Sequence, residues 1–229
     1  MADCANERGF LPFFLNDITG FSIAELCPPE LWFSDEQEGP WDWKGPAIID
    51  GDLAYGKFFQ RKAGYVSMEW FPDFVNYRRS VIEITDAERQ MLDVIRTHKS
   101  LLSKEVKRLC GYAMPRPKRC ANPLEKMMDQ EIRRREAKAK PRRESYETAI
   151  TALQMSTMVV TADFEYGIDK QGNKYGFGVA RYCTPEDFFG PERIRVDRTP
   201  QESYERIKEH LVKLLPGVPL QSIERFIKP

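Results

Sequence analysis

Few side chains in this sequence have the types and spacing that chemistry requires. Two pairs of carboxylates stand close together along the chain: Asp50 with Asp52, and Glu69 with Asp73. The first pair lies in a turn, where aspartate is common for conformational reasons. Glu69 lies in an aromatic stretch beside Trp70, a setting that raises a carboxyl pKa and suits a general base. The alternative is a partly buried carboxylate with a structural partner.

Metal and nucleophile chemistry find little support. The two histidines, His98 and His210, are isolated, and the five cysteines are odd in number and lack zinc-site spacing. No glycine-rich phosphate loop precedes a helix. We therefore expect no metal and no cofactor. The beginning of the chain lacks the pattern of a signal peptide, and no apolar run reaches the length of a membrane span. These features predict reduced cysteines, a cytoplasmic location and no membrane partner.

Charge is balanced over the whole chain but not along it. The sequence holds 35 Lys and Arg against 35 Asp and Glu. Residues 1–50 carry ten acids against two bases, whereas residues 99–143 carry fifteen bases against five acids. A chain of this kind can present a local positive field on one face. The alternative is that the basic run is a solvated helix surface.

The basic residues give the clearest candidate site. Phosphate binding by such residues is driven by release of counterions and carries no base-reading information. One cluster consists of Arg133, Arg134, Arg135, Lys138, Lys140, Arg142 and Arg143. Lys170 and Lys174 flank a turn further along the chain, where they either contact a nucleic-acid backbone or only aid solubility.

The order of elements around these residues points to a class of partner. Three helical segments, the first opened by a Thr85–Glu88 capping box and the third at 144–154, lead into two strands joined by a turn at 169–173. Three helices followed by a hairpin are typical of a winged helix-turn-helix, in which the third helix enters a DNA groove. A basic helical insertion at 113–142 separates the second helix from the third, with Asn122 and Pro123 opening its helix.

Polar and basic side chains are expected on the exposed face of helix 144–154. The candidates are Arg142, Arg143, Tyr146, Glu147, Thr148 and Thr151. Arg142 and Arg143 would contact phosphates at the helix N-terminus, while Glu144 and Glu147 would oppose them. A winged helix used for protein contacts is the alternative. We expect one core of Leu92, Ile95, Leu109, Ile150, Leu153, Val160 and Phe164.

The N-terminal part is rich in aromatic residues. Short β-type runs, including Trp41–Ile49, are bounded by turn residues and predict a small antiparallel sheet over residues 40–71. The aromatic side chains serve either core packing or stacking on bases. The fold class is therefore α+β. We predict an aromatic-rich α/β module at 1–80, a winged helix at 81–190, and C-terminal helices at 191–229.

Several segments together resemble a known family. WDWKGPAI, AYGKFF, YVSMEWFPDFVNYRR, SYETAITALQM and VARYCTPEDFFG are similar to proteins related to AlkZ. AlkZ is a bacterial winged-helix DNA glycosylase that removes alkylated bases and unhooks DNA crosslinks. Its catalytic signature is Gln-x-Gln or Gln-x-Asp, which positions and activates a water at the sugar carbon. Gln154 matches the first glutamine, but Ser156 stands at the second polar position. This departure counts against glycosylase activity and leaves DNA binding open.

The sequence therefore predicts a protein that binds double-stranded DNA, mostly through phosphates, and that is linked to repair of alkylated DNA. An active DNA N-glycosylase is one alternative, with Glu69 and Gln154 as the candidate catalytic residues. A winged-helix module for protein contacts, without nucleic-acid binding, is the other alternative. The sequence identifies no protein partner.

Overall fold

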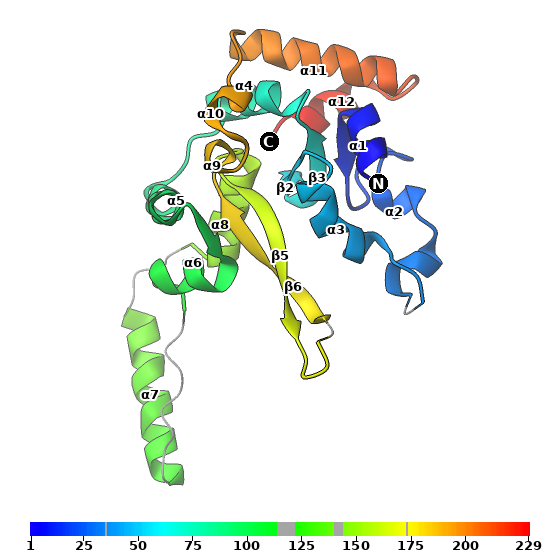
Figure 1. Cartoon of the computed structure of the whole chain (residues 1–229). Helices are drawn as coiled ribbons and strands as arrows, with labels where there is room; N and C mark the ends of the chain where they lie inside the picture. The colour runs from blue at the N-terminus through cyan, green and yellow to red at the C-terminus, as the bar shows by residue number, and fades with distance from the viewer. Residues whose placement is uncertain (35, 114–121, 140–143, 173) are drawn as a thin grey trace.

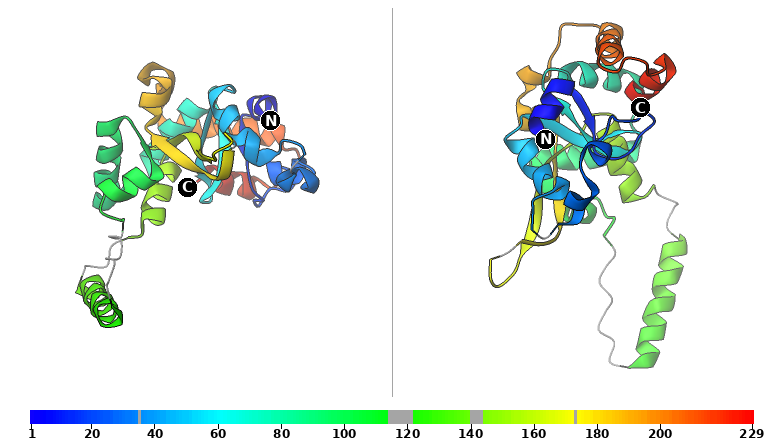
Figure 2. Two further views of the ribbon diagram at one scale, coloured as in Figure 1. Left: turned by 60° about the horizontal axis from the view of Figure 1, so that its bottom comes forward. Right: turned by 90° about the vertical axis from the view of Figure 1, so that its right-hand side faces the viewer.

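The computed structural model describes the chain apart from residues 35, 114–121, 140–143 and 173. In the described part, helices surround two antiparallel sheets of three strands each, which confirms the α+β class. Helix α11 (Pro200–Leu214) crosses one end of the molecule, and the hairpin of β5 (Val160–Ile168) and β6 (Lys174–Cys183) extends from the other (Figure 1). Helix α7 (Pro123–Ala139) lies apart from the body on the same side as the hairpin (Figure 2).

The first sheet belongs to the N-terminal part of the chain. Its strands lie in the order β1 (Phe10–Pro12), β3 (Lys62–Ser67) and β2 (Leu53–Phe59). The surrounding elements are α1 (Ala2–Arg8), α2 (Ile23–Leu26), the 3-10 helix η1 (Pro29–Phe33) and α3 (Pro40–Ile49). Strands β2 and β3 were predicted. Strand β1 was not, because its three residues are all buried and show no alternation.

The predicted strand at Trp41–Ile49 is wrong, since this segment forms α3. The helix opens with Pro40 at its first position, where the fixed φ of proline suits a helix. Asp42 then accepts a hydrogen bond from the backbone N–H of Gly39 at 3.0 Å. Some of the residues that indicated a strand instead lie on the buried side of this helix. Ile48, for example, packs in the core beside β2.

The middle of the chain follows the predicted order, with an extra helix at its beginning and one extra strand. Its elements are α4 (Phe71–Val81), α5 (Asp86–His98), β4 (Ser100–Leu102), α6 (Ser103–Leu109), α7, α8 (Tyr146–Met155), β5 and β6. The second sheet has the strand order β4, β6, β5. Thr85 and Glu88 form the predicted capping box, and Asn122 accepts a hydrogen bond at the start of α7. Helix α8 begins two residues later than the predicted start, with Ser145 as its N-cap.

The C-terminal part consists of α9 (Pro185–Phe189), α10 (Pro191–Ile194), α11 and α12 (Leu220–Ile227). Thr199 and Glu202 form a capping box at the start of α11. These helices do not stand alone. Helix α11 packs on α4 and α12, so the end of the chain covers elements formed near its beginning.

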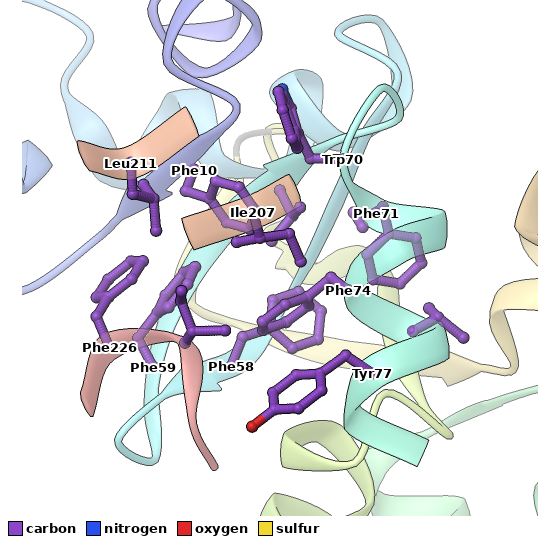
Figure 3. Packing of buried hydrophobic residues seen from close by; sticks show 14 of the residues in the cluster. Phe10, Phe58, Phe59, Trp70, Phe71, Phe74, Tyr77, Ile207, Leu211 and Phe226 are labelled. Atoms are coloured by element: carbon purple, nitrogen blue, oxygen red, sulfur yellow. The ribbon is translucent and has the colours of Figure 1, made fainter. Parts of the chain in front are cut away.

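The largest core cluster joins the two ends of the chain (Figure 3). Phe58, Phe59 and Phe74 meet Ile207 and other apolar side chains of α11 and α12. The rings of Phe59 and Phe226 stack with centroids 4.6 Å apart. Most of the N-terminal aromatic residues thus serve the core rather than a base-stacking surface. The cluster draws on residues of all three predicted segments, and the division into 1–80, 81–190 and 191–229 stays a prediction.

The core predicted around the helix–hairpin region is divided among three clusters. Leu92, Ile95, Ile150 and Leu153 share one cluster, as predicted. Val160 belongs to the aromatic cluster, and Phe164 packs against a third cluster beneath α3. Leu109 was predicted to face inward, but it is exposed on α6.

A buried arginine fixes the position of α8 against the aromatic core. The guanidinium of Arg78 is fully buried and donates to the carbonyl oxygens of Met155, Phe58 and Lys228, each at 3.2 Å. Burial lowers the pKa of Arg78 to about 9. Since Met155 ends α8, Phe58 lies in β2 and Lys228 follows α12, one side chain connects three elements.

Candidate functional site

Helix α8 is the segment predicted to be a recognition helix, and its inner side is completely buried. Ala149, Ile150 and Leu153 pack against α5 and its neighbours, and Leu153 is 0% exposed. The side chain of Tyr146 is also buried, which raises its pKa to about 12, and its hydroxyl lies 3.0 Å from that of Ser103. This side of α8 has the composition and burial of a core helix.

The outer side of α8 is covered by the hairpin of β2 and β3. Gln154 is 2% exposed, and its Oε1 accepts a hydrogen bond from the backbone N–H of Lys57 at 3.1 Å. Its Nε2 donates to the carbonyl oxygen of Ile150 at 3.0 Å. The ammonium of Lys57 donates to Thr151 at 3.3 Å, and the N–H of Arg61 points to the sulfur of Met155 at 3.3 Å. A groove of DNA cannot reach this side unless the first sheet moves.

The expected exposed face of α8 is therefore wrong in part. Tyr146 and Thr151 are buried, and Arg142 and Arg143 lie outside the described residues. Glu147 is exposed but forms an ion pair with Lys107 of α6 at 2.8 Å. Only the first turn of α8 borders solvent with polar side chains, so this helix positions its neighbours rather than offering a reading surface.

The two candidate catalytic residues have different surroundings. Glu69 is not held in an apolar pocket, because its side chain is 65% exposed. Its carboxylate lies 3.5 Å from the guanidinium of Arg206. Arg206 in turn pairs with the buried Asp73 at 2.6 Å and stacks over Trp70 with its Cζ 3.8 Å from the ring centroid. No contact joins Glu69 to Gln154, whose amide is fully engaged with backbone groups.

Helix α7 carries the central part of the predicted basic cluster. Arg133, Arg134, Arg135 and Lys138 belong to this helix, while Lys140, like the arginines beyond it, lies outside the described residues. The side chain of Arg135 is exposed and pairs with Glu131 at 3.2 Å, one helical turn earlier. An exposed ion pair of this kind is weak and leaves the guanidinium available to a phosphate.

Helix α7 also carries an apolar stripe without cover in the described part of the chain. Its members are Leu124, Met127, Met128 and Ile132, each more than half exposed. The helix that carries this stripe stands apart from the body in both views of Figure 2.

Helix α6 adds cations that the candidate list from the sequence omitted. Lys104 and Arg108 are exposed, and Lys107 is half-buried with its ammonium 4.6 Å from the ring centroid of Tyr146. Gly111, with φ of 71°, ends this helix. The excess of basic residues over 99–143 already contained this signal, because Lys104 and Arg108 are spaced by one helical turn on the polar side of α6.

The tip of the β5–β6 hairpin holds Lys170, which is exposed, and Lys174 begins β6. At the base of the hairpin Arg181 forms an ion pair with Glu165 on the neighbouring strand and donates to Ser100. Arg181 is therefore committed to the sheet. In Figure 1, α6, α7 and the hairpin tip lie on the side opposite α11.

Phosphate binding is the chemistry that these exposed cations can perform. Among the described residues, no group of three His, Cys, Asp or Glu side chains could hold a metal ion. Within the same residues, no helix has the length and apolar character needed to cross a membrane.

Comparison with known proteins gives one match. A family model described as AlkZ related matches residues 1–228, nearly the whole chain, which confirms the resemblance found in the sequence. No curated protein and no solved structure matches.

Proposed function

Because the chain belongs to the AlkZ-related family, we propose that it binds double-stranded DNA, mainly through the phosphates, and serves the repair of alkylated DNA. We further propose that α5, β4, α6, α8, β5 and β6 form a winged helix-turn-helix. The order of these elements and the antiparallel β4, β6, β5 sheet support this assignment. A cytoplasmic location stays a prediction.

The single observation that carries the proposal is the exposure of cations around an enclosed α8. Lys104 and Arg108 on α6, Arg135 on α7 and Lys170 at the hairpin tip are all exposed. The elements that carry them lie on the side of the molecule opposite α11 (Figure 1). Helix α8 lies beneath β2 and contributes no exposed base-reading face. The proposed interface therefore follows the backbone of the duplex, with α6, α7 and the hairpin tip as its three points of contact.

The experiment is binding to a random-sequence duplex as a function of salt. We expect affinity to fall as salt rises, since each phosphate contact releases counterions. Replacing Arg133, Arg134 and Arg135 with alanine should weaken binding to every sequence and lower the salt slope by about 0.9 per lost contact. An unchanged slope and affinity would remove α7 from the interface.

A matched control removes the same charge elsewhere. Lys213, Arg225 and Lys228 are exposed on or next to α11 and α12, away from α7. The triple alanine variant of these residues should bind duplex as the wild type does. Equal weakening by both triple variants would indicate a general charge effect rather than a defined interface. Absence of any duplex binding by the wild type would favour the protein-contact alternative.

An active DNA N-glycosylase is the enzyme alternative, and the family is its main support. The surroundings of the two candidate residues support binding without base release. Gln154 uses both ends of its amide on backbone groups, and Glu69 is exposed and paired with Arg206. Release of a methylated base from alkylated duplex by the wild type would establish the activity. Release that persists in Glu69→Gln and Gln154→Ala would assign the chemistry to other residues.

A further inference from the structure

The apolar stripe of α7 lies on a helix that stands apart from the body. Its four side chains, from Leu124 to Ile132, are between 53% and 67% exposed. The later three follow Leu124 by three, four and eight residues, a spacing that places all four on one side of the helix. An exposed apolar surface of this kind marks a site of contact with another macromolecule. The stripe therefore needs a partner that the described part of one chain does not supply.

A second exposed apolar surface lies at α2 and η1. Phe33 is 81% exposed, Leu26 45% and Phe14 37%. They border one cluster of rings, in which the ring centroid of Phe13 lies 5.2 Å from that of Phe14 and 5.5 Å from that of Trp32, the neighbour of Phe33. A backbone N–H of α2 donates to the carbonyl oxygen of Phe13 at 3.1 Å, which holds the helix of Leu26 beside the same cluster. We call Phe14, Leu26 and Phe33 the η1 patch.

Negative charge flanks the η1 patch. Residues 25–38 hold five acids and no base. Glu30, Glu36 and Glu38 are exposed, and none of them forms an ion pair within the described part of the chain. Complementary charge guides association and selects the partner. A partner for the η1 patch is therefore expected to combine apolar side chains with positive charge.

Helix α7 and the residues after it have this combination. The stripe at 124–132 is followed by residues 133–143, which hold seven bases and one acid. In Figure 1, α7 and α2 lie on opposite sides of the molecule with the β5–β6 hairpin between them, and the left view of Figure 2 shows the same separation. The two surfaces of one chain therefore do not meet. A second copy of the chain is the partner that brings them together.

From the two exposed apolar surfaces and their opposite charges, we propose that the stripe of α7 docks on the η1 patch of a second copy. The bases after the stripe then lie near the acids that flank the patch. Four side chains cover less than the roughly 800 Å² per partner of a standard interface. Reciprocal docking doubles the buried area, and the resulting two-fold dimer is closed, so it does not extend into a filament. This inference goes beyond the proposed DNA binding and does not rest on it.

The test is sedimentation velocity of the full-length protein over a range of concentrations, without DNA. We expect a reversible monomer–dimer equilibrium. Met128→Gln with Ile132→Gln alters the stripe, and Leu26→Gln with Phe33→Gln alters the η1 patch. Each pair replaces exposed apolar side chains, so each should weaken dimerisation by at least about tenfold while the fold, followed by circular dichroism, is kept.

A matched control replaces two exposed apolar side chains of α11 and α12. Val212→Gln with Leu220→Gln should dimerise as the wild type does, because these residues belong to neither surface. An equal mixture of the stripe variant and the patch variant should form more dimer than either variant alone. The mixed pair keeps one contact in which both the stripe and the patch are unaltered.

Three outcomes would overturn the proposal. A wild type that stays monomeric at about 100 µM would show that the two surfaces do not associate usefully. A patch variant that dimerises as the wild type does would mean that the stripe pairs elsewhere, for instance with a second stripe. Equal weakening by the control variant would indicate non-specific apolar association. Because DNA is absent, failure of this proposal and failure of the proposed DNA binding are distinguishable.

Discussion

Helices α7 and α8 differ in solvent exposure, which the order of elements along the chain does not show. Helix α8 is the helix that the sequence predicted to enter a DNA groove, yet the core covers one side and β2 covers the other. Helix α7 interrupts the helix order, yet its apolar residues Leu124, Met127, Met128 and Ile132 are exposed, and it carries three consecutive arginines. The position of a helix in a fold does not determine what it can touch. Exposure does: α8 is committed to packing, whereas α7 presents described side chains to solvent.

The largest test of this difference compares an α8 residue with an α7 residue. Leu153→Ala removes a side chain that is fully buried in the core, and we expect it to reduce the free energy of unfolding by about 2–5 kcal/mol. Met128→Ala on α7 removes an exposed side chain, and the expected change is within about 0.5 kcal/mol. Urea unfolding followed by circular dichroism measures both. Similar losses for both variants would mean that α7 packs against the body in solution.

A feature of the fold could be predicted from the sequence where the residues that indicate it lie close together along the chain. The capping box at Thr85 and the β5–β6 hairpin were predicted because each rests on residues a few positions apart. The buried outer side of α8 was not predictable, because Gln154 and Lys57 are 97 positions apart in the sequence. The inward position expected for Leu109 was wrong, because only Val106 of α6 is buried and Leu109, the last residue of this helix, is 42% exposed.

The composition of α3 shows a second limit of prediction from the sequence. Tryptophan and isoleucine favour strands, but their preference reflects burial on a pleated surface rather than a backbone requirement. The stronger local signal was Pro40 followed by Asp42, which opens a helix. The charge asymmetry was informative but coarse. It indicated a basic region over 99–143 without showing that the exposed cations include Lys104 and Arg108 on α6.

Gln154 provides a further test of the buried outer side of α8. Gln154→Ala leaves the backbone N–H of Lys57 without its acceptor in a partly buried position, so we expect a loss of about 1–3 kcal/mol in stability. Gln154→Glu keeps the acceptor but loses the donor to Ile150 and adds a buried charge, which should also destabilise the protein. A catalytic glutamine without a structural role would give the opposite result, full stability with lost base release.

The cations on α6 provide a test in which stability should remain constant. Lys104→Ala with Arg108→Ala removes two exposed charges, and the expected change in stability is within about 0.5 kcal/mol. Duplex affinity should nevertheless fall, and the salt slope should decrease by up to about 1.8 for two phosphate contacts. A matched pair, Lys213→Ala with Arg225→Ala, should leave both quantities unchanged. If the α6 variant binds like this control, the interface is confined to α7 and the hairpin tip.

The smallest expected effect belongs to Glu69. Its carboxylate is mostly exposed and lies 3.5 Å from Arg206, which already holds the buried Asp73 at 2.6 Å. Glu69→Gln therefore removes a weak surface pair, and stability should change by less than about 1 kcal/mol. Asp73→Asn is the more informative variant near Glu69. It removes a buried charge that pairs with both Arg198 and Arg206, so it should destabilise the protein far more than Glu69→Gln does. If Glu69→Gln instead abolished a base-release activity while leaving stability intact, an exposed residue would be the general base. The division between an enclosed α8 and an exposed contact surface would then no longer describe where this protein acts.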